Sequence, residues 1–238
     1  MKVVAGNWKM HMDPGAAARF FTDFRADQVD GAVRIVVFPP AISLPTSRQA
    51  APDRVEIGVQ NIHPAPSGAF TGECSAEMAA GAGASLVLIG HSERRHVFGE
   101  TDEETGLKVS AGLRAGLIPV VCVGETLEER RGGRLDQVLR RQVAAVRPGL
   151  EGAHAFMIAY EPVWAIGTGE TATPEDASEA HAVVRDALGD LGAAPVLYGG
   201  SVKPGNAQAL MATPGVDGVL VGGASLDPDS FLAIARAA

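Results

Sequence analysis

A single carboxylate, Glu161, stands in the most informative stretch of the chain, residues 159–169 (AYEPVWAIGTG). The apolar run 155–159 before it is typical of a strand that is buried on both faces, as in a parallel sheet. Glu161 is therefore expected at the C-terminal end of a strand, where Pro162 keeps it extended. The glycines at the end of the stretch allow large backbone changes, as a closing lid requires. A lone glutamate here could simply cap the next helix, but the whole run favours a carboxylate that removes protons.

Two further polar residues lie where the first strand should end. Asn7 and Lys9 follow the apolar run 3–5, and Lys9 is one of only four lysines in the chain. A single lysine is usually a solvated surface residue. Because Lys9 stands beside Asn7 at a predicted strand end, we interpret it instead as the local cation of a site.

The segment 90–95 (GHSERR) places His91 where a helix should begin, after the apolar run 85–89. The partial positive charge at a helix N-terminus disfavours a protonated imidazole. His91 is therefore expected to stay neutral and to donate a hydrogen bond as an electrophile. The other histidines lack this setting, so we interpret His63 as structural and the rest as surface or packing residues.

Two glycine clusters follow the last two apolar runs. Gly199-Gly200-Ser201 comes after run 195–198, and Gly222-Gly223 comes after run 218–221. Glycines let backbone N–H groups approach phosphate oxygens closely. Either cluster alone could be an ordinary tight turn. Together, at the ends of the last two strands, they predict a phosphate site in the usual place for barrel enzymes.

The elements that must position these residues alternate along the whole chain. Apolar, β-branched runs occur at 3–5, 34–38, 55–59, 85–89, 118–123, 156–159, 195–198 and 218–221, and helix-like segments lie between them at 16–24, 75–82, 103–115, 137–146, 174–188 and 204–211. The order predicts an α/β fold, a single-domain (β/α)8 TIM barrel over residues 1–238, with a doubly wound open sheet as the alternative. In a barrel the C-terminal ends of all strands meet on one face, so the polar residues above should share one site.

The charge balance limits the partners of such a site. The 238 residues carry a formal net charge of -8 at pH 7, which argues against nucleic acid or an anionic membrane, since both bind basic surfaces. A phosphate site must therefore be positive locally, through backbone N–H groups and a lysine.

The only cysteines, Cys74 and Cys122, are too few for a disulfide framework and lack metal-site spacing. We expect no metal and no cofactor. Because no run resembles a signal peptide or a membrane span, we expect a cytoplasmic protein.

Five segments together resemble the triosephosphate isomerase family: NWK at 7–9, GHSERR at 90–95, AYEPVWAIGTG at 159–169, YGGSV at 198–202 and VGGASL at 221–226. They stand in the family's order and span essentially the whole chain. The resemblance implies an isomerase of glycolysis and gluconeogenesis that interconverts dihydroxyacetone phosphate and D-glyceraldehyde 3-phosphate through an enediolate. These isomerases are themselves a standard example of a glutamate base beside a neutral histidine under a closing loop.

The resemblance assigns catalytic roles to four residues of this sequence and a supporting role to a fifth. Glu161 would be the base that moves a proton between neighbouring carbons, and His91 would polarise the carbonyl. Lys9 and Asn7 would bind the substrate and stabilise the enediolate charge. Glu93 would orient Lys9.

The resemblance also implies a binding set. Backbone N–H groups would hold the phosphate, from Gly167, Ser201, Gly222 and Gly223. When the lid closes, Ile166 and Leu220 would press on Glu161, and the apolar surroundings would raise the pKa of its carboxyl group. The long loop 61–73 would dock into a second subunit of a homodimer and bring Thr71 near the partner's site.

Two other functions remain open. A sugar-phosphate aldolase or lyase on the same fold would need an imine-forming lysine at a strand end, and only Lys9 could serve. A metal-dependent one would need clustered ligands, but only His63 and His91 follow strands. A non-catalytic phosphate-binding barrel would be favoured if Lys9, His91 or Glu161 were missing, and all three are present.

Overall fold

Eight parallel strands close into a barrel in the computed structural model, which describes residues 1–165 and 172–238. Each strand pairs with the next along the chain, and β8 pairs with β1. The strands are β1 (Val3–Asn7), β2 (Arg34–Phe38), β3 (Val55–Val59), β4 (Leu86–Ile89), β5 (Ile118–Val123), β6 (Met157–Tyr160), β7 (Val196–Tyr198) and β8 (Gly218–Val221). The predicted (β/α)8 TIM barrel is therefore confirmed, and the open sheet was the wrong alternative.

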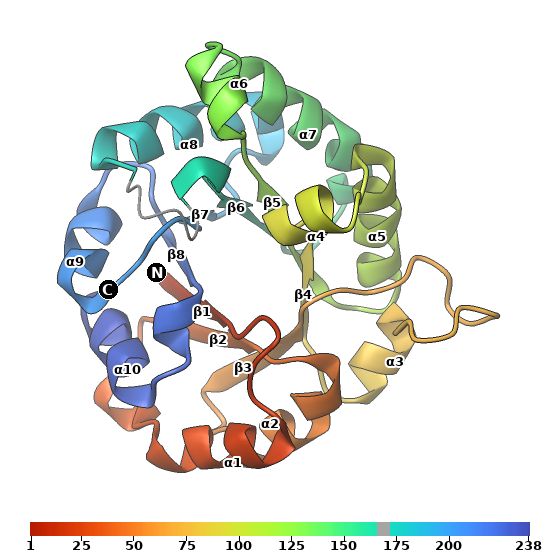
Figure 1. Cartoon of the computed structure of the whole chain (residues 1–238), viewed down its shortest axis with the longest axis vertical. Helices are drawn as coiled ribbons and strands as arrows, with labels where there is room; N and C mark the ends of the chain where they lie inside the picture. The colour runs from red at the N-terminus through yellow and green to blue at the C-terminus, as the bar shows by residue number, and fades with distance from the viewer. Residues whose placement is uncertain (166–171) are drawn as a thin grey trace.

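Helices form a ring around the strands (Figure 1). Those of the described residues are α1 (Pro14–Asp23), α2 (Leu44–Ala50), α3 (Ala76–Gly81), α4 (Ser92–Val97), α5 (Asp102–Arg114), α6 (Leu127–Arg131), α7 (Leu135–Leu150), α8 (Pro174–Leu188), α9 (Pro204–Ala212) and α10 (Pro228–Arg236). The sequence prediction missed α2, α6 and α10. The first two have seven and five residues, too short for a clear helical period. For α10, however, Asp227 as N-cap and Pro228 at the first position were a usable start signal.

Strand residues alternate between two apolar layers. Side chains that point into the barrel form one buried cluster, with Val3, Ala5, Val36, Phe38, Leu86, Leu88, Val120, Cys122, Met157, Ala159, Leu197 and Leu220. The intervening residues, such as Val4 and Ile158, pack outward against the helices. Because successive strand side chains point to opposite faces, the next inward position after Ala159 is Glu161. The alternation therefore aims Glu161 over the barrel's centre.

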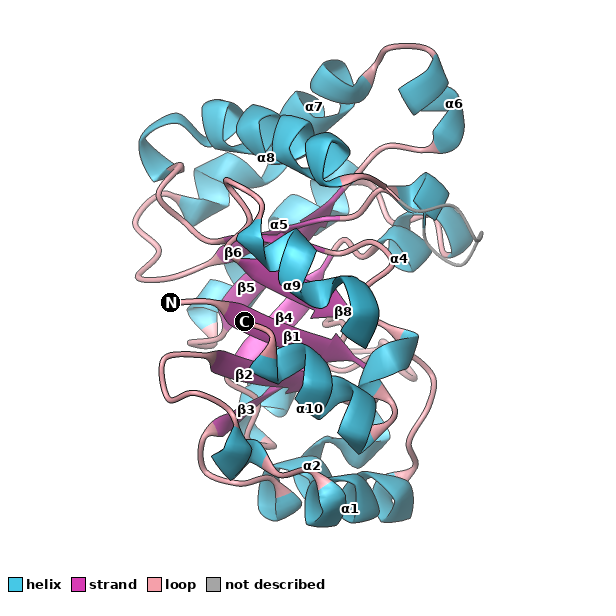
Figure 2. Cartoon of the chain, turned by 90° about the vertical axis from the view of Figure 1, so that its left-hand side faces the viewer, coloured by secondary structure: helices cyan, strands magenta, loops and turns pink. Residues whose placement is uncertain are grey.

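The loop between β3 and α3, which contains residues 61–73, projects away from the ring of helices (Figure 1). The strands lie inside the helical layer, and the two chain ends lie close to each other (Figure 2). Among the described residues, no helix combines the length and apolar character that crossing a bilayer requires.

Candidate active site

A cavity of about 360 Å³ opens at the C-terminal ends of the strands. It receives residues that follow β1, β4, β6, β7 and β8, as the barrel prediction required. Among its lining residues are Asn7, Lys9, His91, Glu93, Glu161, Ser201, Leu220, Gly222 and Gly223. The fold thus brings together all predicted site residues that the structure describes, with the exception of Thr71.

Glu161 is 2% exposed and uses both carboxylate oxygens. Its Oε1 lies 2.9 Å from His91 Nε2, and its Oε2 accepts a hydrogen bond of 2.7 Å from the Ser92 backbone N–H. Both partners belong to the start of α4. The end of β6 and the start of α4 therefore meet at this carboxylate.

His91 is the N-cap of α4, and its Nδ1 accepts the Glu93 backbone N–H at 3.2 Å. An imidazole nitrogen that accepts a hydrogen bond carries no proton, so the proton of neutral His91 lies on Nε2. This Nε2–H points at Glu161. The nitrogen that faces Glu161 is thus the donor, as an electrophile requires.

Contact between these two groups shifts the pKa of each. Burial raises the pKa of Glu161, but the His91 imidazole and the Ser92 N–H outweigh burial, and the pKa is lowered. Burial lowers the pKa of His91, but the Glu161 carboxylate outweighs burial, and the pKa is raised. Our expectation for His91 considered only the helix end, and the Glu161 carboxylate acts in the opposite direction; that His91 stays neutral remains a prediction. The rise in the pKa of Glu161 was expected for a closed lid with Ile166 against the carboxylate; Ile166 lies outside the described residues, so this stays a prediction.

Lys9 has a left-handed backbone, with φ of 50°, which is uncommon for a residue with a side chain. Local contacts hold it there, because its N–H donates to Asn7 Oδ1 at 3.0 Å and its carbonyl accepts from Gln60 Nε2 at 2.9 Å. The Lys9 ammonium lies 2.6 Å from Glu93 Oε1. The predicted orientation of Lys9 by Glu93 is therefore geometrically in place.

The glycine clusters supply backbone donors to the cavity. Among the hydrogen bonds of residues 1–165 and 172–238, none uses the N–H of Ser201 or Gly222. Gly222 precedes the 3₁₀ helix η5 (Gly223–Ser225). Neither N–H therefore has a partner among the described residues, and an anion site here stays a prediction.

Four predicted residues remain to be placed. Gly167 and Ile166 lie outside the described residues. Thr71 is exposed in the projecting loop, so within one chain it does not reach the cavity. Leu220 belongs to the inner barrel cluster and also lines the cavity.

Glu125 is a buried carboxylate that the sequence reasoning missed. Its Oε1 accepts hydrogen bonds from Tyr160 Oη at 3.0 Å and from Trp164 Nε1 at 2.8 Å, so it holds the residues on both sides of Glu161. Burial raises the pKa of Glu125. The signal was present, since Glu125 follows the predicted strand 118–123 as Glu161 follows its own. Within the described parts of the chain, no three His, Cys, Asp or Glu side chains gather as a metal site.

The chain is similar to known isomerases over nearly its whole length. A family model described as Triosephosphate isomerase matches residues 2–238. A protein of Symbiobacterium thermophilum named triosephosphate isomerase is 50% identical over 246 residues, covering 99% of this chain and 96% of that protein. A protein of the same name from Alkalilimnicola ehrlichii is 51% identical over 247 residues, covering 99% and 98% respectively. The chain therefore belongs to the triosephosphate isomerase family.

Proposed function

We propose that this chain is a triosephosphate isomerase, which interconverts dihydroxyacetone phosphate and D-glyceraldehyde 3-phosphate with residues 1–238 working as one domain. The observation that carries the proposal is the convergence of Glu161, His91 and Lys9 on one cavity that Ser201, Gly222 and Gly223 also line. Family membership supports the same reaction.

In the proposed reaction, the Glu161 carboxylate takes a proton from the carbon beside the substrate carbonyl and returns it to the neighbouring carbon. His91 donates its Nε2–H toward the carbonyl oxygen, where negative charge develops in the enediolate. The Lys9 ammonium, with Asn7 beside it, stabilises that charge. Isomerisation moves one carbon-bound and one oxygen-bound proton within a single substrate molecule, so the reaction requires no cofactor.

The phosphate is proposed to bind at the Ser201, Gly222 and Gly223 N–H groups. They line the same cavity as Glu161, at the ends of β7 and β8. Neutral backbone donors bind an anion without adding basic side chains, which fits a chain of net charge -8. Gly167 remains a predicted fourth donor.

A coupled assay tests this function. The purified chain is given each triose phosphate in turn, and formation of the other is followed through a linked dehydrogenase. Turnover in both directions, with solvent deuterium entering the carbon that Glu161 deprotonates, is the expected result. A folded protein that binds the phosphates without turnover would instead be a non-catalytic barrel, and cleavage products would indicate an aldolase.

We further propose that the chain acts in the cytoplasm as a homodimer, joined through loop 61–73 with Thr71 close to the partner's cavity. Exposed apolar side chains near the projecting loop support this, with Phe70 at 46%, Phe98 at 66% and Met10 at 94% exposure. Such residues cluster at protein interfaces.

Light scattering on wild type and on Phe70→Glu tests the dimer. The wild type should have the mass of two chains at micromolar concentration, and Phe70→Glu should shift it toward one, because a carboxylate in the interface is desolvated. Leu107→Glu, an exposed position on α5, is the control that should remain dimeric. A wild-type mass of one chain contradicts the proposal.

A further inference from the structure

The backbone pairing of β4 with β5 stops just short of the active site. Its last pair joins Ile89 with Val121, and the next residues, Gly90 and Cys122, lead into the site. Arg95 on α4 continues the connection, because its Nε donates to the Gly90 carbonyl oxygen at 2.8 Å and its Nη2 to the Cys122 carbonyl oxygen at 3.3 Å. A side chain thus joins the two strand ends beyond the point where the backbones do.

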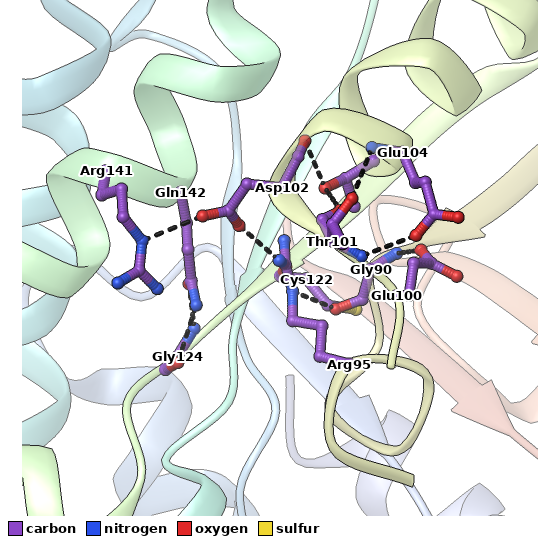
Figure 3. A network of polar contacts seen from close by, with 11 residues as sticks. Gly90, Arg95, Glu100, Thr101, Asp102, Glu104, Cys122, Gly124, Arg141 and Gln142 are labelled. Atoms are coloured by element: carbon purple, nitrogen blue, oxygen red, sulfur yellow. Dashed lines mark hydrogen bonds and ion pairs between the residues drawn. The ribbon is translucent and has the colours of Figure 1, made fainter. Parts of the chain in front are cut away.

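Arg95 is itself fixed by an ion pair. Its side chain is 7% exposed, and its Nη1 lies 2.6 Å from Asp102 Oδ1. Asp102 Oδ2 lies 2.9 Å from Arg141 Nε on α7, and Figure 3 shows this chain of contacts from α7 to the strand ends. A guanidinium presents its donors in a rigid plane, so three bound acceptors are held in one relative geometry.

On the β4 side, these contacts fix the residue before His91. Gly90 has φ of 69°, which turns the chain from the strand into α4. Its carbonyl is bound by Arg95, and its N–H donates to Glu100 Oε1 at 3.1 Å (Figure 3). Because His91 is the N-cap of the helix that carries Arg95, the contact sets the angle at which this helix leaves the strand.

On the β5 side, the same arginine reaches the backbone behind Glu161. The Glu161 N–H donates to the Val123 carbonyl at 2.7 Å, one residue after Cys122. The Gln142 side chain then binds both the N–H and the carbonyl of Gly124, at 2.8 Å and 3.1 Å. The end of β5 therefore supports Glu161, while the end of β4 supports His91.

We propose that Arg95 is a positioning residue for the isomerisation, because by joining Gly90 to Cys122 it sets where His91 stands relative to Glu161. This inference rests on the proposed isomerase function. Arg95 is not among the described residues that line the cavity, so it acts through the backbone and not by touching substrate.

The test replaces Arg95 in the full chain by Lys and by Met. A lysine keeps the charge beside Asp102, but its single nitrogen cannot bridge both carbonyls in the same plane. In both variants kcat should fall by roughly tenfold to a hundredfold, because small displacements of catalytic groups have large effects on rate. KM should change less than about threefold, since substrate contacts remain.

Arg34→Met is the matched control. Arg34 joins β2 to β3 through an ion pair with Glu56, with Nε 2.5 Å from Oε1, at the ends of the strands remote from the cavity. The Arg34→Met substitution should lower Tm and leave kcat unchanged. If Arg95→Lys also lowers Tm alone and keeps wild-type kcat, Arg95 is merely structural and the proposal is overturned. Should Arg95→Met not fold, Arg95→Lys decides the question by itself.

An NMR measurement separates this proposal from the proposed function. In ¹⁵N-histidine-labelled protein, the proton on His91 Nε2 should give a downfield signal, because it is hydrogen-bonded to Glu161. Its position should change in Arg95→Lys and not in Arg34→Met. An unchanged signal in Arg95→Lys overturns the positioning role even if the wild type is an active isomerase. An inactive wild type with a changed signal would overturn the isomerase function, and with it the role in isomerisation, and leave only the structural link from Arg95 to the His91–Glu161 contact supported.

Discussion

Glu161 holds one contact at each carboxylate oxygen, with His91 at Oε1 and the Ser92 N–H at Oε2. To take a proton from a substrate carbon, the carboxylate must exchange at least one of these contacts for the substrate. The side chain's length decides whether it can make that exchange, because the backbone of Glu161 is fixed by the Val123 carbonyl. At the residue scale, the reach of the Glu161 side chain therefore matters as much for proton transfer as its charge.

We predict that Glu161→Asp lowers kcat by roughly a hundredfold and leaves KM within a few-fold. Removing one methylene withdraws the carboxylate by about 1.5 Å, and a displacement near 1 Å can cost about a factor of a hundred in rate. Steady-state kinetics in both directions is the measurement, with Glu56→Asp, remote from the cavity, as the control. Unchanged turnover would exclude Glu161 as the base.

At the scale of elements, the backbones at the ends of β5 and β6 lie too close together to admit a side chain between them. Gly124 ends the β5 side of the site, and a Cβ built on it would lie 1.7 Å from the Glu161 carbonyl oxygen. That oxygen belongs to the backbone, so no rotamer change relieves the overlap. The spacing of β5 and β6 therefore requires glycine at this position.

Gly124→Ala should accordingly displace Glu161. We expect at least a tenfold loss of kcat and a loss of about 1–3 kcal/mol in the free energy of unfolding, the usual range for overpacking. Denaturant titration and the coupled assay measure the two effects. Gly31→Ala, where nothing lies within 4 Å of the added Cβ, should change neither. Wild-type values for Gly124→Ala would mean that the strand ends can separate freely.

The elements also show how far the sequence could predict this molecule. Strand positions and the inward direction of Glu161 follow from apolar runs and period-two alternation, which are local. The contact of Glu161 with His91 depends on barrel closure, so the sequence predicted their shared face but not the resulting pKa shifts. Arg95 was overlooked because its role depends on two carbonyls in different strands. The left-handed Lys9 backbone likewise depends on Gln60, which comes from β3's end.

At the scale of the whole molecule, stability responds to pH through one buried histidine outside the site. His181 on α8 is fully buried; its Nδ1 lies 2.9 Å from the Gly215 carbonyl oxygen, and its Nε2 has no partner among the described residues. Burial lowers the pKa of His181 to about 4 from its usual 6.5. Protonation would charge the buried ring and put a hydrogen on Nε2, which has no acceptor among the described residues. The folded state therefore keeps this imidazole neutral.

The sign of the pH effect follows from linkage. Between about pH 6.5 and pH 4 the unfolded chain binds a proton at His181 that the folded chain does not, so stability falls as pH decreases through this window, and the effect is absent above it. We predict that His181→Gln loses stability at pH 7 through poorer packing but that its deficit relative to wild type shrinks by about 2 kcal/mol by pH 5. Denaturant titrations at fixed protein concentration measure this difference, in which contributions from other groups, such as Glu161, cancel. His154→Gln, at an exposed position, should keep the wild-type pH dependence. Parallel curves for wild type and His181→Gln would show that His181 takes up its proton equally in both states, contrary to the burial argument.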